Sequence, residues 1–202
     1  CMNNSGQSCD APTRMLVEQS IFDRVKARVK AAAEAILVGD PAKQGPHMGP
    51  LVSQLHFHRV QDLIHQAIQE GALILAGGPG KPEGFEKGFF CRPTVFTNVT
   101  NDMTIAQEEV FGPVLVLIPF DTEDEAVDLA NDSDYGLAAY VHSLDEKRSK
   151  RIAKRLQAGM VHINGGAIKY GSPFGGYKMS GNGREGGSMG LEEFTEVKVL
   201  HY

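Results

Sequence analysis

The sequence predicts an α/β fold, in which helices flank a largely parallel sheet and one last strand leaves the body. Short apolar segments alternate with helical patterns of roughly ten to twenty residues, the order typical of parallel sheets covered by helices. Hydrophobic residues make up 42% and charged residues 22% of the 202 residues, so the chain can bury a sizeable core and is not a disordered sequence. No repeat or low-complexity linker divides it, and residues 1–195 are expected to form one domain.

The strands are expected where short apolar segments rich in β-formers are bounded by turn residues. The segment 72–76, for example, follows Gly71 and precedes a Gly/Pro-rich loop at 77–84. The expected strands of the body are 13–17, 72–76, 89–96, 114–120, 137–142 and 160–164.

The helices are expected where apolar residues recur three and four positions apart. In the first, over 22–36, this spacing joins Phe22, Val25 and Val29, and Gly39 ends the pattern. A second helix carries an apolar face made by Val60, Leu63, Ile64, Ala67 and Ile68 and stops at Gly71. Two shorter helices are expected over 123–131 and 145–157.

The last segment, 196–202, is expected to be a half-buried edge strand. Val197 and Val199 alternate with Glu196 and Lys198, the period of a strand with one covered face. Because an edge strand offers unpaired backbone groups, we expect it to pair on another subunit, as an oligomerisation strand of a homodimer or homotetramer.

Charge and composition exclude several classes of partner. The count of 20 Lys and Arg against 25 Asp and Glu gives a net charge of −5, which argues against nucleic-acid binding. The segment 145–157 carries six basic residues without an interleaved aromatic, so a solvated helix face is the better interpretation. No apolar segment approaches the ~18 residues of a membrane span. Three cysteines are too few for a disulfide framework, and a cytoplasmic location is expected. Because the chain opens at Cys1 on a polar stretch, we expect it to be cut from a longer protein.

Cys9 is the first candidate for chemistry, because it lies between the polar residues 4–8 and an expected strand. Cys91, behind Phe89 and Phe90, has the setting of a structural cysteine. An ordinary thiol with a pKa of ~8.5 is only slightly ionised at pH 7, so a nucleophilic cysteine needs assistance. The residue types alone leave both interpretations of Cys9 open.

Two other patterns are rejected as functional sites. The string 181–186 fits G-x-G-x-x-G, but no buried strand precedes it and no acidic residue can follow at the required distance, so we interpret it as a loop within the glycine-dense segment 165–187. The histidines at 47, 56, 58 and 65 have no metal-ligand spacing, and no metal site is expected.

The segment 107–114 places two carboxylates beside a Phe-Gly-Pro turn that leads into a buried strand. In a functional interpretation, one Glu projects into a cleft and binds hydroxyls, with Phe111 as a flat wall. In the alternative, this is a charged loop before a strand.

Taken together, these motifs resemble the aldehyde dehydrogenase superfamily, and specifically its C-terminal part, which carries the catalytic cysteine. The resemblance covers essentially the whole chain, with the motifs in the family's order. They are Asn4-x-Gly6-Gln7-x-Cys9-x-Ala11-x-x-Arg14, then 49–52, then 107–113, then 130–132 with 135–138, and then Asn164 before 172–181.

The resemblance implies an aldehyde dehydrogenase-like catalytic domain over 1–195 and a reaction that oxidises an aldehyde to a carboxylic acid. Cys9 is implied to form a thiohemiacetal and then a thioester. NAD or NADP is implied as cofactor, bound mainly by an N-terminal half that is absent here, so the isolated chain is expected to be inactive. The implied roles are cofactor binding for Glu109 and Phe111, substrate binding for Ser8, Asp10 and Phe174, and support of the site for Asn164. His56 and Arg59 fall where the family often contacts the cofactor, but His56 departs from the usual Gln, and neither is included.

Alternatives stay open at this stage. A truncated, non-enzymatic interaction module would use the last strand to join a partner's sheet. A CoA-acylating aldehyde dehydrogenase would share the cysteine and pass the acyl group to coenzyme A. Lys169, in the loop expected at the substrate entrance, is either a partner for a semialdehyde's carboxylate or a solvated lysine.

Overall fold

The computed structural model describes residues 1–202, which form two compact units, Cys1–Leu129 and Ala130–Tyr202. The sequence did not indicate this division. The assignment of residues 1–195 to one catalytic domain stays a prediction.

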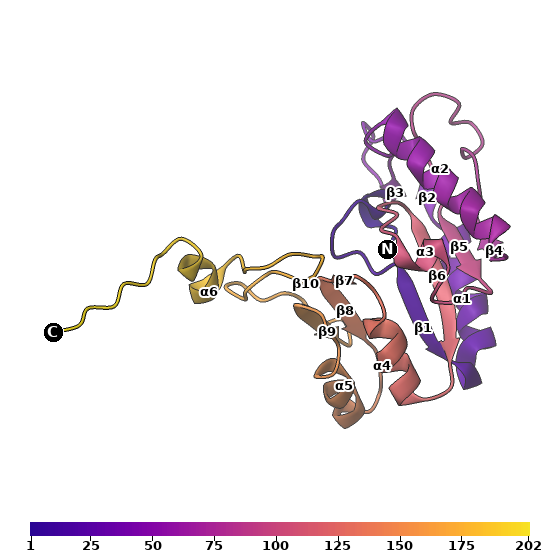
Figure 1. Cartoon of the computed structure of the whole chain (residues 1–202). Coiled ribbons are helices and arrows are strands. Elements are labelled where there is room, and N and C mark those ends of the chain that lie inside the picture. Colours follow the sequence, from indigo (N-terminus) through magenta and orange to yellow (C-terminus); the bar gives the residue numbers. More distant parts are fainter. The chain divides into compact units, whose positions relative to one another are not determined.

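The first unit is built on a four-stranded sheet (Figure 1). Its strands lie in the order β1-β6-β5-β4, and their bounds are Arg14–Glu18 for β1, Val114–Phe120 for β6, Thr94–Thr97 for β5 and Leu73–Ala76 for β4. β6 runs parallel to both neighbours, with Leu16 opposite Ile118 and Val95 opposite Leu115, whereas β4 is antiparallel to β5. The predicted α/β class with a largely parallel sheet is therefore confirmed.

Helices cover both faces of this sheet, so that a hydrophobic core lies on each face. The side chains of β6 alternate between these two cores. Val114, Val116 and Ile118 belong to the larger core, with α2 (Gln54–Gln69) and α3 (Thr104–Gln107). Leu115 and Leu117 point to the smaller core, with α1 (Phe22–Glu34). A strand buried on both faces must be apolar throughout, which explains why 114–120 is a continuous apolar run.

Short elements complete the first unit. A 3₁₀ turn, η1 (Asn3–Gly6), precedes the cysteine, and another, η2 (Gln19–Ile21), leads into α1. The two-residue strands β2 (Leu37–Val38) and β3 (His47–Met48) pair in parallel. α4 (Glu123–Asn131) lies at the boundary between the two units.

The second unit contains a β-α-β motif and a glycine-rich region. β8 (Ala138–Val141) and β9 (Met160–Ile163) are parallel and joined through α5 (Glu146–Ala153). β7 (Tyr135–Gly136) and β10 (Tyr177–Lys178) form an antiparallel pair, and α6 (Gly187–Glu192) follows. The string 181–186 lies in a loop between β10 and α6.

Two expected strands differ from the structure. The strand predicted over 89–96 was wrong for its first part, because only Thr94–Thr97 joins the sheet. Pro93 has no N–H to donate to a ladder, and Gly88, with φ +81°, turns the chain before it. The strand predicted over 196–202 was wrong for the single chain, because these residues belong to no strand.

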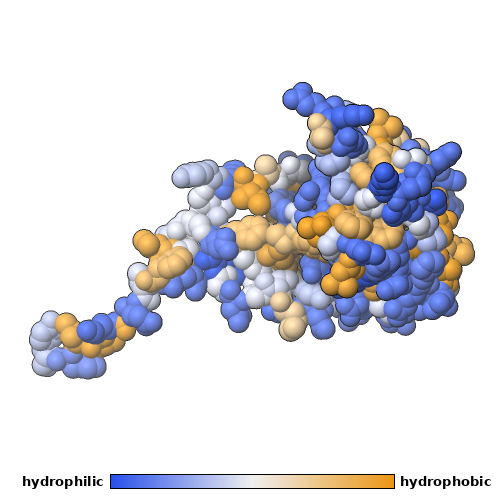
Figure 2. Space-filling view, turned by 90° about the horizontal axis from the view of Figure 1, so that it is seen from above, coloured by the Kyte–Doolittle hydropathy of each residue, from blue (hydrophilic) through white to orange (hydrophobic).

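This terminal segment is exposed along its length. Figure 1 shows it leaving α6 as an extended stretch, and Figure 2 shows hydrophobic residues among hydrophilic ones along it. Val197, Val199 and Tyr202 are exposed hydrophobic side chains. A strand needs a neighbour to accept its backbone hydrogen bonds, and the chain offers none there, which explains the missing strand. No helix combines the length and apolar character that a bilayer crossing requires.

Candidate active site

Cys9 lies in a turn between η1 and β1 and is an exposed free thiol. A hydrogen bond from Ala11 N to Ser8 O, 3.1 Å long, closes the turn around it. The Ser8 hydroxyl donates to Asp10 Oδ1 at 2.5 Å, so the two side chains predicted to bind substrate pair with each other across the cysteine.

Three successive residues before the cysteine have left-handed backbones. The φ angles of Asn4, Ser5 and Gly6 are 51°, 58° and 72°. Left-handed backbone costs about 1–2 kcal/mol per ordinary residue, and such strain persists only where the surroundings fix it. Ser5 supplies part of that fixation, because its side chain is buried and its hydroxyl donates to Gly49 O at 2.7 Å.

Gln7 fastens the same loop to the segment after β3. Its side-chain carbonyl accepts the N–H of Val52 at 2.8 Å, and its amide nitrogen donates to Asn4 O at 3.0 Å and Pro50 O at 3.4 Å. The two matched motifs at 4–14 and 49–52 therefore fold as one structure, which holds the residues before Cys9 in place.

The loop that carries the predicted cofactor residues is held by the larger core and by α2. Val110 is buried in the larger core, whereas the neighbouring Glu109 is exposed and its carboxylate has no hydrogen-bond or ion-pair partner in the chain. Phe111 is half-buried and has a left-handed backbone with φ 52°. Two residues of α2 hold the loop's carbonyls: His56 Nε2 lies 2.7 Å from Phe111 O, and Arg59 Nη2 donates to Glu109 O at 2.9 Å.

The loop 4–9, here the cysteine loop, and the loop 108–113, here the cofactor loop, touch at two glycines. A Cβ on Gly6 would lie 2.0 Å from Gly112 O, so only a glycine allows this approach. Cys9 follows Gly6 closely, and Phe111 directly precedes Gly112. The structure therefore brings together the loops that bear Cys9, Glu109 and Phe111.

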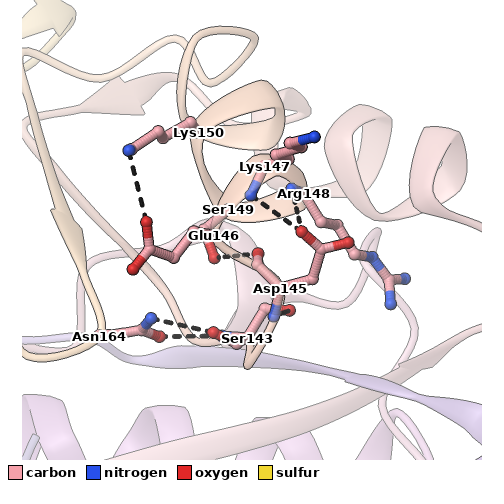
Figure 3. A network of polar contacts seen from close by, with 8 residues as sticks. All are labelled: Ser143, Asp145, Glu146, Lys147, Arg148, Ser149, Lys150 and Asn164. Carbon is pink, nitrogen blue, oxygen red and sulfur yellow. Dashed lines mark hydrogen bonds and ion pairs between the residues drawn. The ribbon is translucent and has the colours of Figure 1, made fainter.

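Asn164 and Phe174 belong to the second unit. Asn164 has φ 51°, and its side-chain amide bonds both backbone groups of Ser143: Oδ1 accepts from Ser143 N, and Nδ2 donates to Ser143 O, each at 2.9 Å (Figure 3). Phe174 is half-buried and exchanges two backbone hydrogen bonds of 2.7 Å with Glu185. Asn164 thus ties the end of β9 to the turn before α5.

Figure 3 also shows how that turn becomes a helix. Asp145 is the N-cap of α5, and its carboxylate accepts the N–H groups of Lys147 and Arg148 at 2.9 and 3.0 Å. Lys150 pairs with Glu146 at 3.6 Å, four positions apart. These contacts are those of a capped surface helix.

Cys91, unlike the exposed Cys9, is a buried thiol. It is 1% exposed in the larger core, and its sulfur accepts a hydrogen bond of 3.2 Å from Gln61 Nε2. Burial raises the pKa of the Cys91 thiol to about 11, an effect that this hydrogen bond offsets only in part. A buried thiol that stays protonated is unreactive, as the structural interpretation of Cys91 predicted.

Sequence reasoning missed the residues that hold the two loops. Ser5 and Gln7 were noted only as polar neighbours or motif letters, and His56 and Arg59 were set aside. Each of these four bonds a backbone group about 45–55 positions away, which no local pattern reveals. No group of three His, Cys, Asp or Glu side chains that could hold a metal occurs in the chain.

Comparison with known proteins gives a consistent result. The model of the aldehyde dehydrogenase family matches residues 1–200. A 3-succinoylsemialdehyde-pyridine dehydrogenase from a Pseudomonas species is 49% identical over 199 residues, which are 98% of this chain and 42% of that protein.

Solved structures agree with the fold. An aldehyde dehydrogenase from Bartonella henselae superposes with a TM-score of 0.94 at 52% identity, covering 96% of this chain and 41% of that one. A mutant of aldehyde dehydrogenase C from Pseudomonas syringae, solved with NAD+ and octanal, gives a TM-score of 0.94 at 49% identity, covering 96% and 40%. The chain spans about two fifths of the length of these relatives.

Proposed function

The chain belongs to the aldehyde dehydrogenase family, and from this premise we propose that it is the C-terminal, nucleophile-bearing part of an NAD(P)-dependent enzyme that oxidises an aldehyde to a carboxylic acid. The coverage of about two fifths of each relative supports the view that it is part of a longer polypeptide. We place that enzyme in the cytoplasm, as a homodimer or homotetramer.

In the proposed reaction, the thiolate of Cys9 forms a bond to the aldehyde carbon, and the carbonyl electron pair moves to oxygen. The backbone N–H of Cys9 stabilises this thiohemiacetal oxyanion, a type of contact whose loss costs about 3–4 kcal/mol in other enzymes. Departure of a hydride from the same carbon leaves a thioester on the sulfur. Water then attacks the thioester, so that the carbon–sulfur bond breaks and the acid and the thiol are released.

Glu109 and Phe111 fit a nicotinamide cofactor. A bound NAD or NADP supplies the acceptor for the departing hydride. The Glu109 carboxylate is exposed and has no partner within the chain, so both oxygens are available to accept hydrogen bonds from ribose hydroxyls. The His56 contact fixes the backbone of Phe111, and its half-buried ring offers a flat apolar surface.

Ser8, Asp10 and Phe174 are proposed to contact the aldehyde. Asn164 is proposed to support the loop that begins at Gly165. Lys169, exposed in this loop, would attract the carboxylate of a semialdehyde. The Pseudomonas relative is named as a semialdehyde dehydrogenase, which makes semialdehydes the class of substrate to test first. Lys169→Met should lower the ratio of kcat/KM between a semialdehyde and an uncharged aldehyde, and an unchanged ratio would exclude this role.

The observation that carries the proposal is the position of Cys9, exposed in a turn that follows a strained loop braced against the Phe111–Gly112 turn. Cys9→Ser in the longer polypeptide should abolish NAD(P)H production from octanal, while Cys91→Ser retains it. Normal turnover by Cys9→Ser would exclude the mechanism. The isolated 202-residue chain, without the rest of the polypeptide, should form no NAD(P)H.

A second function, a non-enzymatic interaction module, is favoured by the exposed apolar side chains of the last segment. The two functions differ in the reactivity of Cys9. In the enzyme, iodoacetamide labels Cys9 of the folded longer polypeptide faster at pH 7 than Cys9 of the same polypeptide after denaturation, whereas the buried Cys91 reacts slowly in either function until the chain is denatured. A Cys9 that labels no faster in the folded than in the denatured chain would favour the interaction module.

A further inference from the structure

We infer that His56 is a positioning residue: it holds the peptide of Phe111 in its left-handed conformation and thereby fixes the direction of the Phe111 ring. This role in the cofactor site rests on the proposed function, whereas the contact itself belongs to the structure. No motif pointed to it, because His56 and Phe111 are 55 positions apart.

His56 makes two contacts with the same residue. Its Nε2 lies 2.7 Å from the Phe111 carbonyl oxygen, and because a carbonyl only accepts, Nε2 carries the proton and donates it. Its ring meets the Phe111 ring edge to face, with centroids 6.1 Å apart and planes at 61°. One side chain therefore restrains both the backbone and the ring of Phe111.

Phe111 needs such a restraint. A φ of 52° is unusual for a bulky aromatic residue, and the free energy that it costs must come from surrounding contacts. The residues on either side fix the peptide chain without fixing the Phe111 carbonyl: Val110 is buried in the core, and Gly112 packs against Val60. That carbonyl accepts its hydrogen bond from His56.

His56 is itself well placed to act as a restraint. It lies in the first turn of α2, where the N-cap Ser53 accepts its backbone N–H at 3.2 Å. The next residue, Phe57, is buried in the core, so the helix cannot rotate freely. Arg59, one turn further on the same face, holds the carbonyl of Glu109 at 2.9 Å. Two side chains of α2 thus bind the carbonyl oxygens of Glu109 and Phe111.

The first test uses the 202-residue chain without cofactor. Imidazole ¹⁵N shifts of His56 should show the Nε2–H tautomer, and the backbone ¹³C shifts of Phe111 should show a left-handed residue. The opposite tautomer in the unmodified chain would overturn the inference without any variant. His56→Phe should remove the left-handed signature of Phe111, and His56→Gln, whose amide can donate from a similar position, should retain it. His58→Phe, on an exposed position of the same helix, is the matched control and should change neither.

The second test uses the longer polypeptide. His56→Phe should raise KM for NAD about three- to tenfold, the effect of losing one hydrogen bond, and leave KM for octanal within about twofold. His56→Gln should restore the wild-type KM, and His58→Phe should not alter it. An unchanged KM for NAD, or an equal rise in both KM values, would overturn the inference. If the wild-type enzyme turned over no aldehyde, the proposed function would fail, whereas the NMR result would still decide the contact.

Discussion

At the residue scale, the candidate site contains left-handed residues in two turns that are in contact with each other. Asn4, Ser5 and Gly6 form one strained turn and Phe111 the other, and they meet where Gly6 approaches Gly112. Strain of this kind is stored where neighbouring contacts over-determine the backbone, and it pre-organises a site. Here, the contacts are hydrogen bonds from Ser5 and His56 to main-chain carbonyls.

Gly6→Ala tests whether the two turns depend on each other. Its Cβ would meet Gly112 O at 2.0 Å, and its φ of +72° is unfavourable for alanine. We expect a loss of about 2–4 kcal/mol in the free energy of unfolding, about 1 from the backbone and the rest from the clash. Urea denaturation measures it. The control is Gly84→Ala, which has a similar φ of +80° and open space around it, so it should lose only the backbone part. Equal losses in both variants would contradict the close contact.

Asn164 combines a left-handed backbone with a side chain that bonds both backbone groups of Ser143. Asn164→Ala should lower the free energy of unfolding by about 2–3 kcal/mol, from two hydrogen bonds and an unfavourable φ. Asn164→Gly keeps the backbone freedom and loses only the hydrogen bonds, so it should be about 1 kcal/mol more stable than the alanine variant. Denaturant titrations of the two variants separate these contributions. Identical stabilities would mean that the backbone conformation contributes nothing.

At the element scale, one carboxylate joins the end of α2 to the start of α3. Glu70 Oε2 accepts from Thr104 N at 2.8 Å, and its Oε1 accepts from Thr104 Oγ1 at 2.6 Å and from Gln66 Nε2 at 3.0 Å. These hydrogen bonds, that of the Thr104 hydroxyl above all, lower the pKa of Glu70 from its usual 4.5. The charged carboxylate is therefore favoured in the folded state.

The lowered pKa of Glu70 makes the folded state less stable in acid. Because the folded pKa is the lower one, the stabilisation is complete above the unfolded pKa and is lost as pH falls through the folded value. Glu70→Gln should flatten the decline in the free energy of unfolding between about pH 5 and 3. Since Glu70 is largely exposed, the loss at neutral pH should stay below about 1 kcal/mol. Glu83→Gln, an exposed loop carboxylate, should leave the pH profile unchanged. A profile unaltered by Glu70→Gln would contradict the argument.

The sequence predicted those elements whose patterns are set by their own burial. The bounds of β6 and α4 agree with the expected 114–120 and 123–131, because a doubly buried strand and a capped helix leave clear patterns. The sequence also pointed to Cys9, Glu109 and Phe111 through their motifs, and the roles of these three residues stay predictions. It could not predict the left-handed turn at 4–6, the short pairs β2–β3 and β7–β10, or the contacts of His56 and Gln7. These depend on backbone groups that only the folded chain brings close.

At the scale of the whole molecule, the chain leaves several apolar side chains exposed on its last residues. Val197 is 92% exposed and Val199 68%, and they alternate with charged residues. Scattered exposed hydrophobic residues are ordinary, but an alternating row of them on a segment without regular structure is typical of a strand that awaits a partner. The oligomerisation role of 196–202 stays a prediction, and the single chain neither pairs nor covers this segment.

The alternation itself provides a sharp test of that role. If the segment forms a strand in an oligomer, Val197 and Val199 point to one face and Glu196 and Lys198 to the other. In the longer polypeptide, Val197→Asp with Val199→Asp should weaken assembly by at least about a hundredfold, since each buried valine contributes roughly 1.5 kcal/mol or more. Glu196→Ser with Lys198→Ser, on the opposite face, should leave assembly within about threefold of wild type. Sedimentation velocity over a concentration series measures both. If the two double variants weakened assembly equally, the segment would not bind as a strand, and if neither did, the oligomer would form through another surface.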